Sequence, residues 1–115
     1  MAKLLSKPKR KKFDDLCDTS CPVRRSLDVL DGKWTILVLR DLLSGTKRFG
    51  QLRRSLGGVN PKTLTERLKQ LEKANIVTRK IFAEVPPRVE YTLTQKGQSL
   101  KPVIAALGKW GSEWL

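Results

Sequence analysis

Apolar residues recur every three to four positions over most of the chain, which is the spacing of amphipathic helices. The clearest such helix runs from Asn60 to about Ala74. The side chain of Asn60 suits an N-cap and Pro61 suits the first helical position, so its start is well defined. Its narrow apolar stripe consists of Leu64, Leu68 and Leu71. The opposite face is polar, as in a solvated surface helix or in a helix that lies in the major groove of DNA.

The same spacing predicts three earlier helices. The first begins at Cys21-Pro22, the second spans residues 33–43 and the third spans residues 49–56. The apolar positions of the first helix include Val23, Leu27 and Leu30. The buried side of the second carries Trp34, Leu37, Val38 and Leu42, widened by Ile36, Leu39 and Leu43, and the third has Phe49, Leu52 and Leu56 inward. Gly57-Gly58 supplies a turn after the third helix, which predicts a helix-turn-helix over about residues 49–74.

After this helix pair the pattern changes to that of β-strands. Residues 76–82 and 88–93 are rich in β-branched and aromatic residues, and a proline-containing tip separates them. They predict an antiparallel wing over about residues 76–93, with a short edge strand at Lys47-Arg48. The expected fold class is therefore α+β, mainly α, in a winged helix-turn-helix arrangement over residues 13–115.

The C-terminal segment, about residues 95–115, predicts a helix with Thr94 as N-cap and an interruption near Gly97 and Pro102. Its apolar stripe consists of Leu100, Val103, Ile104, Leu107, Trp110 and Trp114. This stripe could pack on the first two helices of the same chain. We instead expect it to pair with the same helix, and with Val23, Leu27 and Leu30, of a second chain, because it is large for a 115-residue monomer.

Charge indicates an anionic partner. The 24 Lys and Arg residues against 11 Asp and Glu residues give a net charge of +13, and six of these positive charges lie in residues 1–12, a basic arm without acids. The remaining excess clusters at Lys47, Arg48, Arg53 and Arg54. A membrane surface is a weaker candidate, because the arm lacks an apolar face and the chain contains no signal-peptide core or membrane span. The sequence predicts a cytoplasmic protein.

Catalysis has little support, because the chain has no His and no paired-carboxylate or phosphate-loop pattern. With two cysteines and no His it also cannot build a four-ligand zinc site, so we expect no metal and no cofactor. Two classes remain: a regulator that binds double-stranded DNA, and a basic RNA-binding or architectural protein. The few aromatic residues fit core positions and leave no stacking platform for single strands, which favours the regulator.

Several spaced motifs, in order, resemble the HxlR-type (DUF24) winged helix-turn-helix regulators of the MarR-like superfamily. They are Cys-Pro-Val, Gly-Lys-Trp-Thr-Ile-Leu-Val-Leu-Arg-Asp-Leu, Lys-Arg-Phe-Gly-Gln-Leu-Arg-Arg, Asn-Pro-Lys-Thr-Leu-Thr-Glu-Arg-Leu-Lys-Gln-Leu-Glu, Pro-Pro-Arg-Val-Glu-Tyr-Thr-Leu-Thr-Gln-Lys-Gly and Lys-Trp-Gly. The resemblance spans about Cys21 to Trp114. It implies a bacterial homodimeric regulator with N- and C-terminal dimerisation helices and a pseudo-palindromic operator. It also implies that Cys21 senses oxidants or electrophiles.

The resemblance assigns DNA-binding roles by position. The exposed start of the recognition helix corresponds to Lys62, Thr63, Thr65, Glu66 and Lys69. Arg67 flanks the leucine stripe and reaches a phosphate or an internal acid. Contacts with the DNA backbone are expected from Arg48, Arg53 and Arg54. Arg88 places a cation on the wing, near a minor groove or phosphate, unless it pairs across the strands with Glu84 or Glu90.

The two cysteines are expected to differ in reactivity. Cys21 lies at a helix start, close to Arg24 and Arg25, and both the helix dipole and these cations favour the reactive thiolate. The alternative is an inert, half-buried cap residue. Cys17 is either a resolving thiol or a residue without a role in sensing.

Overall fold

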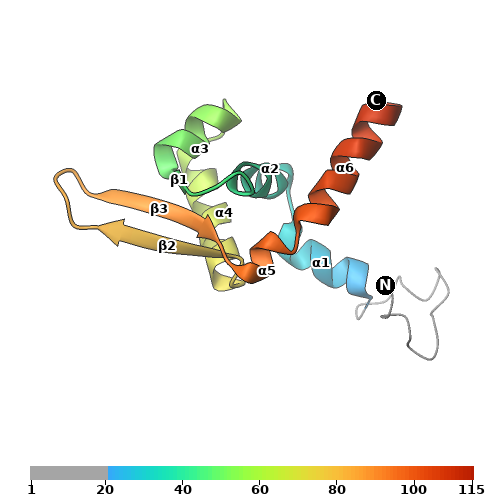
Figure 1. Ribbon diagram of the computed structural model, residues 1–115, viewed down its shortest axis with the longest axis horizontal. Helices are drawn as coiled ribbons and strands as arrows, with labels where there is room; N and C mark the ends of the chain where they lie inside the picture. The colour runs from blue at the N-terminus through green and yellow to red at the C-terminus, as the bar shows by residue number, and fades with distance from the viewer. Residues whose placement is uncertain (1–20) are drawn as a thin grey trace. The chain divides into compact units, whose positions relative to one another are not determined.

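A computed structural model describes residues 21–115 (Figure 1). The chain divides into two compact units. The first ends at Leu30 and the second begins at Asp31. The described part of the first unit contains helix α1, Pro22–Leu30. The predicted basic arm of residues 1–12 and the thiol of Cys17 lie outside the described residues.

The second unit contains the remaining elements. Its helices are α2 Lys33–Leu42, α3 Phe49–Leu56, α4 Pro61–Lys73, α5 Gln95–Gln98 and α6 Lys101–Trp114, and its strands are β1 Lys47–Arg48, β2 Val77–Phe82 and β3 Arg88–Leu93. This mostly helical chain with one small antiparallel sheet confirms the predicted winged helix-turn-helix fold. In Figure 1 the β2–β3 hairpin projects beyond α3 and α4, and α6 extends in another direction.

The three strands form one sheet in the order β1-β3-β2. The β2–β3 pairing runs from Val77 opposite Leu93 to Phe82 opposite Arg88. The expected edge strand at Lys47-Arg48 is confirmed, and Arg48 lies opposite Glu90 on β3. Because α3 begins at the next residue, this pairing fixes the start of α3 against the wing.

The core lies where α2 packs against α3 and α4. Leu64, Leu68 and Leu71 are all buried, as the pattern of α4 predicted. On α2 the predicted burial of Val38, Leu39 and Leu42 is confirmed, whereas Trp34 and Leu37 are only half-buried, and Thr35 is buried although the pattern did not predict it. Thr35 tolerates burial because its hydroxyl donates to the carbonyl oxygen of Asp31 at 2.7 Å.

The predicted C-terminal helix is two helices, α5 and α6. Thr94 is the N-cap of α5, and its hydroxyl accepts a hydrogen bond from the Gly97 amide at 3.1 Å. Gly97 packs so closely on the Ile76 carbonyl oxygen and the Leu93 side chain that a Cβ atom would clash with both. Pro102 lies in the first turn of α6, where a proline needs no backbone N–H, so it marks a new helix start and not a kink.

Candidate nucleic-acid interface

Helix α4 presents a polar face to solvent. The Asn60 side chain accepts a hydrogen bond from the Lys62 amide at 2.8 Å, which confirms the predicted cap. Burial of the leucine stripe turns Lys62, Glu66 and Lys69 outward, with Thr63 and Thr65 half-buried at the flanks. The Thr65 hydroxyl donates to the Pro61 carbonyl oxygen at 2.9 Å, which leaves its lone pairs free to accept. This face therefore offers cations, an acid and hydroxyl groups from one rigid helix.

Helix α3 carries two exposed arginines, Arg53 and Arg54, in its last turn, while Leu52 and Leu56 are buried. Its first turn is closed by the Gln51 side chain, whose oxygen accepts from the Arg48 amide at 2.8 Å. This cap was not predicted from the sequence, although Gln at the third helical position is a known cap signal. A hollow of about 340 Å³ is lined by Arg48, Gly50, Gln51 and Arg54. The three arginines predicted to contact the DNA backbone, Arg48, Arg53 and Arg54, thus lie on α3 or directly before it.

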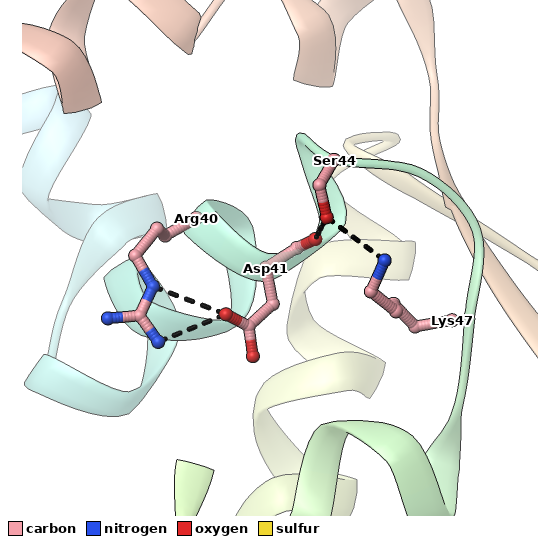
Figure 2. A network of polar contacts seen from close by, with 4 residues as sticks. All are labelled: Arg40, Asp41, Ser44 and Lys47. Atoms are coloured by element: carbon pink, nitrogen blue, oxygen red, sulfur yellow. Dashed lines mark hydrogen bonds and ion pairs between the residues drawn. The ribbon is translucent and has the colours of Figure 1, made fainter. Parts of the chain in front are cut away.

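A chain of polar contacts ties the end of α2 to β1 (Figure 2). Arg40 donates to Oδ1 of Asp41 through Nε at 3.2 Å and Nη2 at 3.0 Å. The hydroxyl of Ser44 donates to the Asp41 carbonyl oxygen at 2.8 Å, and Nζ of Lys47 donates to that hydroxyl at 3.0 Å. Lys47 is thus engaged within the chain, where it holds the segment that leads into α3.

The wing is braced by Arg88. Its guanidinium pairs with Glu84 at 3.3 Å and with Glu90 at 3.4 Å, and it stacks 4.0 Å from the centre of the Phe82 ring. The carboxylate pairing that the sequence left open is therefore present. The DNA contact of Arg88 stays a prediction. Sequence analysis also missed Lys80, an exposed cation on β2 opposite Glu90 and 5.0 Å from the same ring.

At the base of the wing, Tyr91 lies on β3 opposite Arg79, which pairs with Glu72 of α4 at 3.7 Å. Burial raises the pKa of the Tyr91 phenol, nearby Arg79 partly offsets this, and Glu72 adds to it. The phenol is therefore neutral at physiological pH. This cluster connects α4 to the sheet.

Arg67 does not share the outward face of α4. It is half-buried, and its guanidinium lies against Gly32 at the start of α2. One nitrogen donates to Oε1 of Gln70 at 3.2 Å. Among residues 21–115, it forms no ion pair with an acid, so the internal acid that the sequence suggested is not found.

The Cys21 thiol is buried, with 2% of the residue exposed. Its carbonyl oxygen accepts from the Arg25 amide at 2.9 Å, so Cys21 occupies the predicted position directly before α1. Within the part of the chain that the structure describes, no cluster of His, Cys, Asp and Glu could hold a metal ion. None of the helices over residues 21–115 is long and apolar enough to cross a membrane.

The predicted dimer residues are largely uncovered. Val23 and Leu27 of α1 are exposed, and Leu30 is half-buried. On α6 the exposed apolar residues are Val103, Leu107, Trp110 and Trp114. Within the second unit, α6 packs against α2 without covering these four side chains.

Comparison with known proteins agrees with this geometry. The model of the HxlR-like helix-turn-helix family matches residues 29–115. The HTH-type transcriptional regulator sll1512 of Synechocystis sp. is 52% identical over 95 residues, which cover 83% of this chain and 70% of that protein. Regulators of this kind are not enzymes.

Solved structures show the same likeness. A MarR-family regulator from Porphyromonas gingivalis W83 has a TM-score of 0.84 and 39% identity, covering 92% of this chain and all of that chain. The redox regulator HypR in its reduced form has a TM-score of 0.76 and 38% identity, covering 80% of this chain and 91% of that chain. The fold, the sequence motifs and the family match agree, and the chain belongs to the HxlR-like helix-turn-helix family of transcriptional regulators.

Proposed function

We propose that this helix-turn-helix regulator binds a pseudo-palindromic DNA operator as a homodimer. The observation that carries the proposal is the outward polar face of α4, together with the two exposed arginines in the last turn of α3. A helix of this width fits the major groove, where base edges present distinct donor and acceptor patterns. The net charge of +13 supports an anionic partner.

The two helices take different roles in this proposal. Lys62, Thr65 and Lys69 contact base edges and set sequence preference, with Thr63 and Glu66 beside them. Phosphate contacts come from Arg48, Arg53 and Arg54, which add affinity without sequence information. Arg88 supports the wing through its carboxylate and ring contacts, and it reaches DNA only as a secondary contact.

The proposal is tested on a duplex that the purified protein selects from a randomised pool, with a shuffled duplex as control. Thr65→Ala or Lys69→Ala should weaken binding to the selected duplex by about 1–3 kcal/mol and spare the shuffled one. Arg53→Ala should weaken both and lower the salt slope by about 1. Equal losses on both duplexes for all variants, or a preference for single-stranded RNA, would instead favour a nonspecific basic protein.

The homodimer is supported by the uncovered apolar residues of α1 and α6. Burying such a stripe about a two-fold axis would place two recognition helices in successive major grooves, with half-sites about 10 bp or a multiple apart. A footprint limited to one half-site would contradict this arrangement.

A thiol response through Cys21 forms the second part of the proposal. It is supported by the position of Cys21 at the start of α1 and by the likeness to the redox regulator HypR. The family match begins at residue 29, so it does not include Cys21. Because the thiol is buried, we expect small oxidants to act faster than bulky alkylating reagents.

Diamide tests this response, since it takes two electrons and two protons from the Cys21 thiol and a second thiol, that of Cys17 or of Cys21 in the other protomer, and leaves a disulfide. Cys21→Ser should bind the selected duplex like the unchanged protein but should no longer respond to diamide. Cys17→Ser should at most change how readily dithiothreitol reverses the response. An unchanged response in Cys21→Ser would mean that Cys21 is an inert cap residue.

A further inference from the structure

Arg67 is the one recognition-helix cation that turns inward. Nε, Nη2 and Cζ of its guanidinium lie 3.6, 3.7 and 3.9 Å from the point where a Cβ atom of Gly32 would be. Cζ is slightly farther than both nitrogens, so the guanidinium approaches Gly32 with the edge that carries Nε and Nη2. Gly32 has a φ of +89°, a conformation that favours glycine, so the surface under the guanidinium is bare backbone.

This contact is costly for a charged side chain. Nε of Arg67 is buried without a hydrogen-bond partner among the described residues, and the bond to Gln70 is made to a neutral amide. The guanidinium also lies near the N-terminal end of α2, where the helix dipole disfavours a cation. An unbranched apolar side chain would fill the same space without the desolvation cost. Stability therefore does not account for an arginine at this position.

The geometry points to a positioning role, and we infer that Arg67 fixes the rotation of α4 about its own axis. The buried face of α4 is a narrow stripe of three leucines, and Arg67 lies at the border of that stripe. A narrow apolar contact resists separation of two helices better than it resists rolling. The rigid planar guanidinium, held between Gly32, the residue directly before α2, and Gln70 of α4, acts as a stop against rolling.

The consequence concerns DNA sequence preference, so this inference rests on the proposed function. Lys62, Thr65 and Lys69 project from α4, and recognition groups must stay within about 10–20° of their productive orientation. A roll of α4 would misplace all three together. Phosphate contacts from α3 would be unaffected, because they come from another helix.

The test compares Arg67→Met with Arg67→Lys in the full chain. Arg67→Met should melt at or above the temperature of the unchanged protein because it removes the buried charge, whereas Arg67→Lys keeps that charge and should melt at or slightly below it. Both should bind the selected duplex about tenfold or more weakly, yet bind the shuffled duplex with unchanged affinity and salt slope. Lysine should not rescue, because it keeps the charge but lacks the planar group. Lys73→Met, which removes an exposed cation from the last turn of α4, is the control for charge loss and should preserve the preference.

Several results would overturn the inference. A salt slope reduced by about 1, with weaker binding to both duplexes, would make Arg67 a direct phosphate contact. Rescue by lysine would assign the effect to charge, and unchanged binding in both variants would leave Arg67 without a role. If the unchanged protein itself does not distinguish the selected from the shuffled duplex, the proposed function fails first, and the inference fails with it.

Discussion

Helices α4 and α6 have nearly the same length, 13 and 14 residues, and both carry apolar residues at intervals of three or four. In α4 the stripe is buried, with exposed fractions of 0% for Leu64 and Leu71 and 1% for Leu68. In α6 the exposed fractions rise from 44% at Val103 to 71% at Trp114. The same pattern is thus buried in one helix and exposed in the other. Periodicity specifies an apolar face but not what covers it.

The difference follows from the neighbours of each helix. Helix α4 is flanked by α2 and β2, which close over its leucines. Helix α6 extends from α5, contacts α2, and has no buried residue along its length. Its polar side is also sparse, so solvation alone gives little reason for two tryptophans there. The following predictions separate a stripe that stabilises one chain from a stripe that joins two.

The largest effect is expected from Leu68→Ala. This change leaves a cavity under α4 and should lower the free energy of unfolding by about 2–5 kcal/mol. Leu107→Ala in α6 is the matched control, because it removes the same atoms from an exposed position. In chemical denaturation at submicromolar protein it should cost little, and equal losses would mean that α6 is buried within the single chain.

Trp110→Asp tests whether the apolar stripe of α6 joins two chains. The carboxylate would make pairing of α6 unfavourable, so the protein should become monomeric and bind the selected duplex about a hundredfold more weakly. Sedimentation velocity and a binding titration measure the two effects. Lys109→Asp introduces the same group one residue earlier and should remain dimeric. Sedimentation of the unchanged protein as a monomer at micromolar concentration would refute the dimer.

The smallest effect is expected at the starts of the two helices. Helix α4 has a side-chain cap, whereas α6 begins after Leu100 without one. Asn60→Ala should therefore lower the free energy of unfolding by about 1 kcal/mol, while Asn60→Asp should retain most of the stability. Thermal unfolding measures both, and a loss in Asn60→Asp equal to that in Asn60→Ala would show that the cap does not stabilise α4.

Local sequence determined most of the secondary structure. Asn60 and Pro61 begin α4, Thr94 begins α5, and the β-rich runs form the wing, because caps, proline geometry and strand preference act within a few residues. The inward direction of the α4 leucines was also predictable, since one face of a helix follows from its period. The candidate base contacts depend on that same period.

Packing between elements set which faces meet. It buries Thr35 of α2, brings Arg67 onto Gly32 and leaves the stripe of α6 open, and the wing geometry pairs Arg88 with two acids. Such contacts depend on packing between elements, which the period of a single helix does not encode. Helix faces follow from local residue order, and the neighbours of each face follow from how the elements pack.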